Sequence, residues 1–334
     1  MREDRQGYLT RRGIIASAAA GGLAVSAGSA AAQRCPETPP PRIKGAPVWL
    51  DLDQQDLDDA YDQSVYAFND RSISERIAAR TKTALEVLGP PERVAYGAAE
   101  IEKVDIYRTN RANAPVMIFI HGGAWRSGRS ANFALYAEVF VKAGAHFVIV
   151  DFNNVIETNG DLFPMVDQCR RAVAWVYRNA ASFGGNPAEI YLCGRSSGSH
   201  LGGCVVITEW EKQGLPRDTL KGAALSSGMY DLKAVRLSKR GNYVKFTDEM
   251  EEALSAQRHL DKIHTPLVLA HGTLETPEFQ RQTREFAAAL AAAGKPVQFI
   301  VAKGYNHPEM GETLGNPYGI MGRAALQMMK LTTA

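Results

Sequence analysis

The sequence predicts an α/β domain built on a mostly parallel β-sheet that is flanked by helices. After Gly97, short apolar runs alternate with longer stretches of helix-forming residues. The runs do not alternate between polar and apolar residues, which is typical of strands that are buried on both faces of a parallel sheet. With 334 residues, 45% of them hydrophobic, the chain is long enough for one such domain with a large core.

The expected elements follow from this change of pattern along the chain. Strands are expected at 101–107, 115–120, 146–151, 190–193, 222–226, 266–270 and 297–302. Helices are expected between them, at 132–143, 164–183, 198–213, 277–293 and 318–330. The sequence has no internal repeat, so a single domain over 49–334 is the simplest interpretation.

Before the sheet, residues 49–96 are expected to form a small N-terminal helical cap. The stretch 50–88 consists largely of helix formers and is closed by Gly89 and two prolines. An acidic run at 51–62 raises the alternative of calcium binding, but it lacks the glycine and the closing glutamate of an EF-hand loop. A solvated helix face explains the run better. The proline-rich segment 33–48 is expected to be an extended linker.

The first 32 residues are expected to be a cleaved export signal. A polar start with Arg11 and Arg12 leads into an Ala- and Gly-rich, weakly apolar stretch, which ends in three alanines before Gln33. This order is typical of a signal peptide, and the adjacent arginines favour the twin-arginine class. The alternative, a membrane anchor, is disfavoured by the glycines and serines of the stretch. We therefore expect a periplasmic or secreted protein without stable membrane insertion after cleavage.

The overall charge argues against a polyanionic partner. The chain has 38 basic and 36 acidic residues, and removal of residues 1–32 leaves no net charge. Nucleic-acid binding is therefore not expected. The four cysteines show no C-x-x-C spacing, which argues against a zinc ribbon, a thioredoxin-type centre or a disulfide scaffold. Neither a metal nor an organic cofactor is expected, and the sequence leaves the oligomeric state open.

The strongest chemical signal is the pentapeptide Gly-Arg-Ser-Ser-Gly at 194–198. It follows a predicted buried strand directly and runs into a predicted helix, which is the context in which G-x-S-x-G presents a nucleophilic serine. The glycines leave room for a strained turn, at which Ser196 is exposed beside a helix N-terminus. A structural turn is the alternative for so short a pattern, but the flanking strand and helix favour a nucleophile.

A second motif, His-Gly-Gly-Ala-Trp at 121–125, stands at the end of an earlier predicted strand. Glycine-rich loops at this place direct backbone N–H groups at a substrate oxygen. The expected donors of such an oxyanion hole are the N–H groups of Gly123, Ala124 and Ser197. His121 is expected to hold the loop by hydrogen bonding. Trp125 either lines the substrate pocket or packs under the loop.

A nucleophilic serine needs a base and an orienting acid, in the chain order serine, acid, histidine for this architecture. Among the histidines after Ser196, only His307 lies in a loop beyond the last predicted strand, where the base belongs. The acid is expected after the penultimate strand. Glu275 is favoured there, because Glu278 lies in the first turn of the next helix and has the ordinary role of offsetting the helix dipole. Asp231, after the preceding strand, is the reserve candidate.

With these residues placed, the chain resembles the kynurenine formamidase (arylformamidase) branch of the α/β-hydrolase superfamily. The resemblance spans nearly the whole chain after the linker and rests on residues 102–107, 121–125, 166–168, 191–194, 227–232, 257–260, 277–279 and 281–282. It implies an α/β-hydrolase fold with Ser196 as nucleophile, Glu275 as acid and His307 as base. The family acid is usually Asp, and Arg195 and Ser197 stand where the family usually has His and Ala. The last two departures concern the substrate rather than the triad.

The sequence therefore predicts an exported serine hydrolase that cleaves small carboxylic esters, short-chain or aryl, through an acyl-enzyme on Ser196. The alternative is an arylformamidase that hydrolyses N-formylkynurenine-like aryl formamides, since the resemblance implies one acyl-enzyme mechanism for both substrates. A non-catalytic binding protein with the same fold is the alternative of another class. The candidates for the substrate pocket are Trp125, Arg195 and Tyr305.

Overall fold

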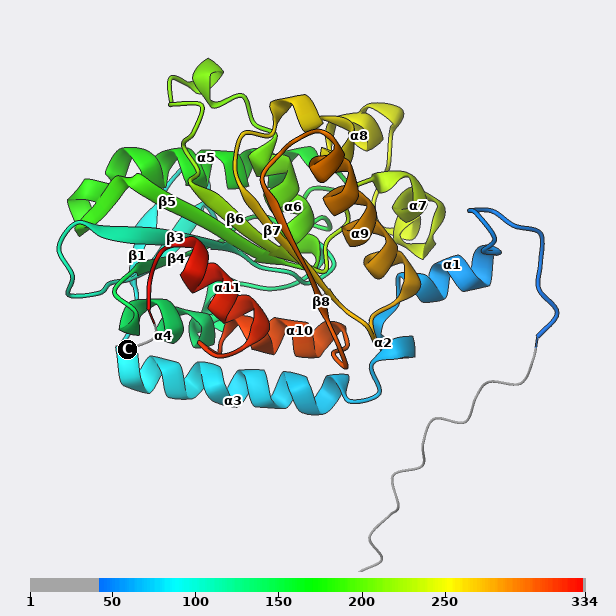
Figure 1. Ribbon diagram of the computed structural model, residues 1–334, viewed down its shortest axis with the longest axis horizontal. Coiled ribbons are helices and arrows are strands. Elements are labelled where there is room, and N and C mark those ends of the chain that lie inside the picture. Colours follow the sequence, from blue (N-terminus) through cyan, green and yellow to red (C-terminus); the bar gives the residue numbers. More distant parts are fainter. Residues whose placement is uncertain (1–41, 333–334) are drawn as a thin grey trace, which may run out of the picture. The chain divides into compact units, whose positions relative to one another are not determined.

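A computed structural model describes residues 42–332, and its centre is an eight-stranded sheet with the order β1-β2-β4-β3-β5-β6-β7-β8 (Figure 1). The strands are β1 (Glu92–Ala95), β2 (Lys103–Tyr107), β3 (Ala114–Ile120), β4 (His146–Val150), β5 (Gly185–Arg195), β6 (Gly222–Ser226), β7 (Leu267–Gly272) and β8 (Val297–Ala302). Strand β2 is antiparallel to both β1 and β4, and the remaining pairs are parallel. The predicted α/β architecture is confirmed.

Helices cover both faces of the sheet. They are α1 (Gln54–Ala60), α2 (Gln63–Tyr66), α3 (Asp70–Leu88), α4 (Ala134–Lys142), α5 (Phe163–Asn179), α6 (Ser197–Val206), α7 (Leu232–Leu237), α8 (Asp248–Ala253), α9 (Pro277–Ala292), α10 (His307–Leu314) and α11 (Ile320–Met328). Helices α5, α6 and α9 lie on one face, and α3, α4, α10 and α11 lie on the other (Figure 1). Each face therefore has its own hydrophobic core.

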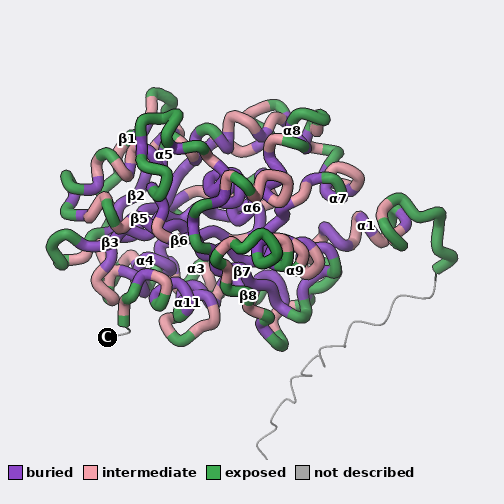
Figure 2. Tube along the Cα trace, turned by 45° about the horizontal axis from the view of Figure 1, so that its top comes forward, coloured by how far each residue is buried: buried purple, intermediate pink, exposed green. Residues whose placement is uncertain are grey.

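Strand β3 shows why the apolar runs are continuous. All seven of its residues are buried, and alternate side chains point to opposite faces of a strand. Val116 and Ile118 join the core under α5 and α6, whereas Met117 and Phe119 join the core under α4 and α11. Figure 2 shows the buried sheet at the centre of the molecule. Both faces of the strand must be apolar because both are covered.

Two helix starts place the residues that follow β7 and β8. At the start of α9, the Thr276 side chain accepts a hydrogen bond from the Phe279 N–H, and Pro277 occupies the first turn. At the start of α10, Asn306 and Glu309 form a reciprocal capping box. Such caps satisfy N–H groups that the helix itself leaves unpaired. They also hold the two connecting segments in one conformation.

The predicted helical cap needs one correction. Helices α1 to α3 occupy its first part, but residues 92–95 form strand β1, which pairs with β2. Most residues of β1 are exposed, so this edge strand has no apolar run that would reveal it. The prediction of a loop at His307 is also wrong, because His307 is the first residue of α10. Helices α7 and α8 were not predicted, since six residues are too few to show a helical period.

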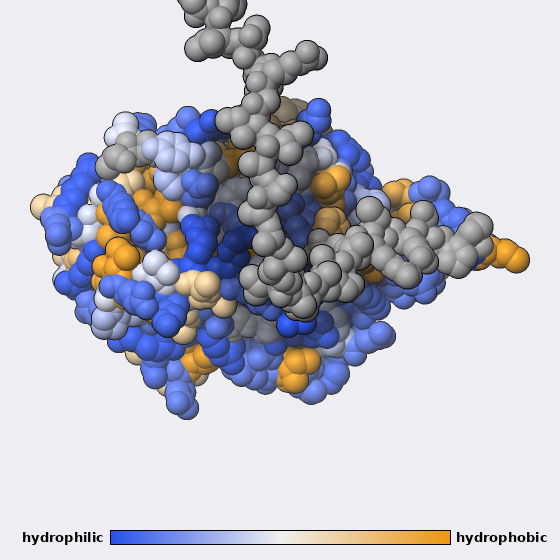
Figure 3. Space-filling model, turned by 90° about the horizontal axis from the view of Figure 1, so that it is seen from below, coloured by the Kyte–Doolittle hydropathy of each residue, from blue (hydrophilic) through white to orange (hydrophobic). Residues whose placement is uncertain are grey.

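The predicted export signal, 1–32, and residues 33–41 of the predicted linker lie outside the described residues. From Arg42 to residue 48 the chain has no helix or strand, and Arg42 forms an ion pair with Asp53. Within residues 42–332, no helix has the length and apolar character needed to span a bilayer. The face in Figure 3 is mostly hydrophilic, with hydrophobic residues in small separate patches. Cys169, Cys193 and Cys204 are buried free thiols.

Candidate active site

Ser196 lies at the sharp turn between β5 and α6. Its φ of 55° and ψ of −128° are strained for a residue with a side chain. The flanking glycines are required by close approach: a Cβ on Gly198 would lie 2.2 Å from the carbonyl oxygen of Ile120, and one on Gly194 would lie 2.7 Å from that of Gly198. The Ser196 N–H donates to the Ser226 carbonyl at 3.0 Å, which ties the turn to β6.

The side chain of Ser196 points away from this scaffold. Its hydroxyl makes no hydrogen bond with the described residues and is not enclosed by them, although the residue as a whole is only 7% exposed. Because Ser196 is also the N-cap of the ten-residue helix α6, the helix dipole favours negative charge beside it. The turn thus presents a hydroxyl in a position that suits nucleophilic attack.

His307 and Glu275 form a buried pair. The Nδ1 atom of His307 lies 2.6 Å from one carboxylate oxygen of Glu275. The other oxygen accepts hydrogen bonds from the Ser227 hydroxyl at 2.8 Å and from the Gly272 N–H at 2.6 Å. With both oxygens engaged, the carboxylate is held in one orientation and fixes the imidazole in turn.

The two other predicted acids are engaged elsewhere. Glu278 pairs with Arg281 and accepts a hydrogen bond from the Tyr61 hydroxyl. Asp231 caps α7 and pairs with Arg258. Among the three predicted carboxylates, Glu275 is the one that contacts His307.

His307 is kept neutral by its surroundings. Burial lowers its pKa, and the positive charges of Arg195 and Arg240 lower it further, whereas Glu275 acts in the opposite direction. The net shift is downward, so at pH 7 the ring donates its Nδ1–H to Glu275 and leaves Nε2 free to accept a proton. Neutral Nε2 is the form that a general base requires.

The N-terminal segment holds the start of α10. The Asn306 side chain donates to the side-chain oxygen of Asn69 at 2.6 Å, and Asn69 donates to Glu309 at 2.8 Å. Phe279 packs its ring against the His307 imidazole, with centroids 4.7 Å apart. The candidate base, His307, is therefore positioned by contacts of α10 with Asn69 before α3 and with Phe279 of α9, which come from distant parts of the chain.

The loop 121–125 packs directly on the turn that carries Ser196. A Cβ on Gly122 would lie 2.8 Å from the Arg195 carbonyl oxygen and 3.1 Å from the Ser196 Cβ. The next three residues, Gly123, Ala124 and Trp125, all have positive φ, at 127°, 54° and 62°. This conformation is costly for the two residues that carry side chains. It turns the backbone away from the sheet, so that the N–H groups of this loop do not pair with a neighbouring strand.

The three predicted oxyanion donors remain available. Within residues 42–332, the N–H groups of Gly123, Ala124 and Ser197 donate no backbone hydrogen bond. The Ser197 hydroxyl accepts a hydrogen bond from the Trp125 N–H at 3.2 Å, which joins the loop to the start of α6. Three free N–H groups next to Ser196 suit the stabilisation of negative charge.

Two buried histidines support this loop. His121 lies 2.9 Å from the Gly122 carbonyl oxygen through Nδ1, and its ring stacks on Phe152. His200 accepts a hydrogen bond from the Trp125 indole at 3.2 Å. Burial lowers the pKa of each to about 4, so both are neutral at pH 7. They hold the loop in place.

The predicted pocket residues lie in three different places. Trp125 is buried under its loop. The Arg195 guanidinium lies against Gly311 of α10, where an added Cβ would be 2.6 Å from the guanidinium carbon. Tyr305 lines a hollow of about 360 Å³ beside α10, together with Arg76 and Glu312. The structure therefore does not bring these three side chains into one pocket.

A cavity of about 530 Å³ opens on the loop 121–125 through Ala124. Its other walls include Tyr61 from the N-terminal segment and Arg240 and Tyr243 from the stretch after α7. These residues were not predicted from the sequence, because nothing in their local pattern marks them. Ser227, the partner of Glu275, carried a usable signal: it is a polar residue directly after a parallel strand, at the sheet edge where such sites form.

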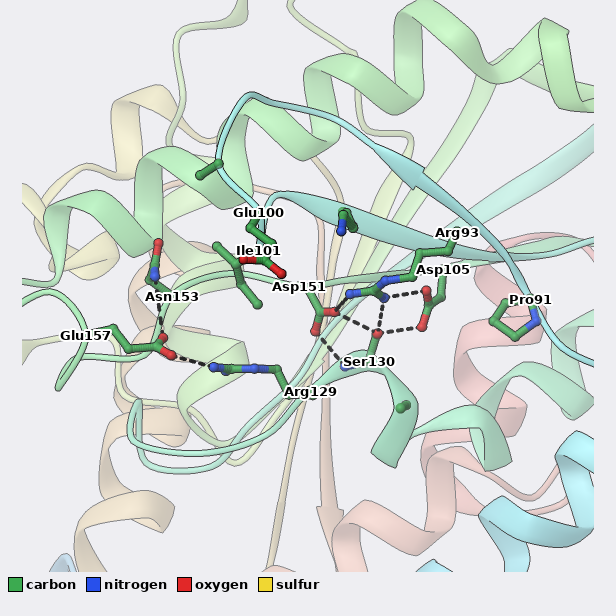
Figure 4. A pocket seen from close by; sticks show the side chains of 13 residues that line it. Pro91, Arg93, Glu100, Ile101, Asp105, Arg129, Ser130, Asp151, Asn153 and Glu157 are labelled. Atoms are coloured by element: carbon green, nitrogen blue, oxygen red, sulfur yellow. Dashed lines mark hydrogen bonds and ion pairs between the residues drawn. The ribbon is translucent and has the colours of Figure 1, made fainter.

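A larger hollow of about 750 Å³ lies over the edge of the sheet at β1 and β2 and includes none of the candidate catalytic residues. Figure 4 shows Arg93 between Asp105 and Asp151, with the Ser130 hydroxyl bonded to both carboxylates. Because these polar groups satisfy one another, the network fastens the β1–β2 hairpin to the sheet. Within residues 42–332, no three His, Cys, Asp or Glu side chains are grouped to hold a metal ion.

The chain is similar to several known proteins. The BD-FAE family matches residues 104–290. Kynurenine formamidase from Danio rerio is 30% identical over 266 residues, which cover 78% of this chain and 86% of that protein. Isoprenylcysteine alpha-carbonyl methylesterase from Arabidopsis thaliana is 25% identical over 247 residues, which cover 65% of this chain and 56% of that protein.

Solved structures support the fold. A protein from Silicibacter sp. TM1040 superposes with a TM-score of 0.67 at 19% identity, over 83% of this chain and 99% of that one. An esterase from Thermogutta terrifontis superposes with a TM-score of 0.59 at 21% identity, over 73% of this chain and 91% of that one. Together with the sequence relatives, these likenesses show that the chain belongs to the formamidase and esterase branch of the α/β-hydrolase superfamily.

Proposed function

We propose that this protein is a serine hydrolase that cleaves carboxylic esters through an acyl-enzyme on Ser196. One observation carries the proposal: a strained turn after β5 presents the Ser196 hydroxyl, and the segments that follow β7 and β8 bring together a buried Glu275–His307 pair with a 2.6 Å contact. The esterases among its relatives support the same chemistry.

In the proposed mechanism, Ser196 Oγ attacks the substrate carbonyl carbon while His307 Nε2 takes the hydroxyl proton. Glu275 keeps the Nδ1–H in place and stabilises the imidazolium that forms. The N–H groups of Gly123, Ala124 and Ser197 donate to the oxyanion. His307 then protonates the leaving group as the carbonyl–oxygen bond breaks, and it later activates the water that hydrolyses the acyl-enzyme.

Aryl formamides are the second candidate substrates, because kynurenine formamidase from Danio rerio shares 30% identity over most of both chains. The same nucleophile, base and oxyanion donors serve both bonds. The two candidates are separated by comparing kcat/KM for N-formylkynurenine with kcat/KM for short-chain aryl esters. A formamide preference above roughly a hundredfold, or about 3 kcal/mol in transition-state binding, reverses the order proposed here.

The proposal is tested with Ser196→Ala and a fluorophosphonate probe. We expect the wild-type protein to be labelled on Ser196 and to hydrolyse aryl esters, and the variant to keep its fold and Tm while losing both properties. Full activity in Ser196→Ala contradicts the mechanism. An unreactive Ser196 in the folded wild-type protein instead favours the alternative that the fold serves as a non-catalytic binding protein.

Export through a twin-arginine signal is proposed from the order of residues in 1–32. The test is fractionation of bacterial cells that produce the full chain, with a variant in which Arg11 and Arg12 are both replaced by Lys. Processed protein outside the cytoplasm is expected from the wild type and unprocessed protein inside the cell from the variant. Equal export of the two excludes the twin-arginine route.

A further inference from the structure

Arg240 is a buried cation beside the candidate active site. It lies on a short 3₁₀ helix, Lys239–Asn242, and is 4% exposed. Its guanidinium is surrounded by the rings of Tyr61, Trp125 and Phe279, at 5.7, 5.4 and 5.9 Å from their centroids. Aromatic faces attract a guanidinium, but they do not satisfy its N–H donors.

Within residues 42–332, no carboxylate pairs with this arginine. Its Nη2 donates a 3.3 Å hydrogen bond to the Tyr61 carbonyl oxygen, and its buried Nε and Nη1 have no partner. Arg258 and Arg281 of the same region each contact carboxylates, Asp231 and Glu278 respectively. Arg240 therefore differs from its neighbours, because a buried charge is normally paired.

The unpaired side chain lines the cavity of about 530 Å³ that opens on Ala124. Among the charged residues of that cavity, Lys239 is paired with Asp62, and Arg126 lies over the Tyr243 ring at 4.5 Å. Asp70, the remaining acid, stands in the first turn of α3. Arg240 is thus the buried positive charge of a cavity that reaches a candidate oxyanion donor.

Arg240 is also close to the candidate base. Phe279 contacts both side chains, with its ring 4.7 Å from the His307 ring and 5.9 Å from the Arg240 guanidinium carbon. The charge of Arg240 contributes to the lowered pKa of His307. One substrate of ordinary small-molecule size could therefore place an anionic group at Arg240 and its carbonyl group at Ser196.

We propose that Arg240 is a specificity residue that binds a carboxylate of the substrate, so that the preferred substrates are anionic esters or amides. This inference rests on the proposed hydrolase function and adds the charge of the substrate. A guanidinium presents N–H donors in a planar fork that matches a carboxylate. Tyr61, Trp125 and Phe279 keep water away from this pair, which strengthens its attraction.

The first test measures a preference for charge. Phenyl butyrate and monophenyl succinate have a neutral and an anionic acyl group of similar size. In the second pair, 4-acetoxyphenylacetamide and 4-acetoxyphenylacetate, the leaving group is neutral or anionic. The kinetics of hydrolysis are compared within each pair. We expect wild-type kcat/KM to favour the anionic member of at least one pair by about tenfold or more. In Arg240→Met this ratio should fall at least tenfold, and Arg240→Lys should restore part of it.

The matched control is Arg126→Met, which removes an arginine from the same cavity. We expect it to change the ratio by less than about twofold. A wild-type protein that prefers neither anionic substrate overturns the proposal. So does an Arg240→Met variant with an unchanged ratio, because a merely structural role would slow both members of a pair equally. If the preference for the anionic substrate is lost in Arg126→Met but kept in Arg240→Met, Arg126 binds the anion, and the proposal for Arg240 is also overturned.

The second test does not depend on catalysis. Calorimetry with benzoate is expected to show binding to Ser196→Ala, and at least tenfold weaker binding to Ser196→Ala combined with Arg240→Met. Equal affinity of the two variants contradicts the role of Arg240. If Ser196→Ala proves fully active but benzoate still binds through Arg240, the proposed mechanism fails and the anion site stands.

Discussion

Glu275 and His307 lie 32 residues apart in the chain, and their side chains meet with 2.6 Å between a carboxylate oxygen and Nδ1. Both are almost fully buried. Removing the negative charge should leave the imidazole without its orienting acceptor. We expect Glu275→Gln to lower kcat for ester hydrolysis by about 10³- to 10⁴-fold, the order found when the acid of such a triad is neutralised. Steady-state kinetics with a Tm measurement check this.

Matched controls for this variant are Glu278→Gln and Asp231→Asn. These carboxylates pair with Arg281 and Arg258 and do not contact His307. Each control should retain kcat within about tenfold, since it changes a salt bridge rather than the catalytic pair. A larger loss in either control than in Glu275→Gln would move the role of the acid to that residue.

The pH dependence of kcat/KM should report the buried base. The reaction needs neutral His307, so the rate rises with pH through the pKa of this residue. Because burial lowers that pKa from 6.5, the acidic limb is expected below pH 6.5. Arg195→Gln removes a charge that lowers the pKa and should move the limb to higher pH. A wild-type limb above pH 7 is incompatible with this assignment.

Stability should fall in mild acid because of His121 and His200. Burial lowers the pKa of each to about 4 in the folded protein. As the pH falls below 6.5, each histidine therefore becomes protonated in the unfolded chain while it stays neutral in the folded one. Each then reduces the free energy of unfolding by about 1.4 kcal/mol per pH unit until about pH 4. Urea unfolding at pH 7 and pH 5 measures this, and His200→Gln should flatten the dependence. An identical pH slope in that variant argues against a neutral buried His200.

The turn that carries the candidate nucleophile, Ser196, should tolerate no side chain at Gly198. Its Cβ would lie 2.2 Å from the Ile120 carbonyl oxygen, and backbone on that side cannot move without disturbing β3. We expect Gly198→Ala to reduce the free energy of unfolding by about 3 kcal/mol or more. Gly214→Ala is the control, because that glycine has a φ of 71° but no atom near its added Cβ. It should cost only about 1 kcal/mol. Gly198 has no positive φ, so a loss no larger than that of Gly214→Ala would contradict the cost assigned to close approach.

The strands of the sheet were predictable to different degrees, and its two edge strands, β1 and β8, show the contrast. Strands β6 and β8 have the predicted bounds, because each is a single β-rich run between turn signals. Strand β1 was hidden within the predicted helical cap, since an exposed edge strand contacts one neighbour and needs no apolar pattern. Strand β8 is also an edge strand with mostly exposed or half-buried residues, so it was predictable from its β-rich composition rather than from burial.

The residues of the candidate site also differ in how far the sequence could predict them. Ser196 and the loop 121–125 could be recognised because their chemistry depends on adjacent residues: a strained turn needs its glycines next to the serine. Arg240 and Tyr61 could not be recognised. They are 179 residues apart, and the hydrogen bond between them forms only after the N-terminal segment folds against the stretch that follows α7.

By itself, the sequence determined the α/β class, the position of the turn that carries the candidate nucleophile, and the small set of residues that could act as acid or base. Those features depend on periodicity and on turn chemistry within a few residues. The tertiary structure alone decided that Glu275 rather than Glu278 or Asp231 contacts His307, and that a buried Arg240 lines the adjoining cavity. Contacts between distant strand ends decide these points, because the free energy of a buried charge depends on which side chains surround it in space.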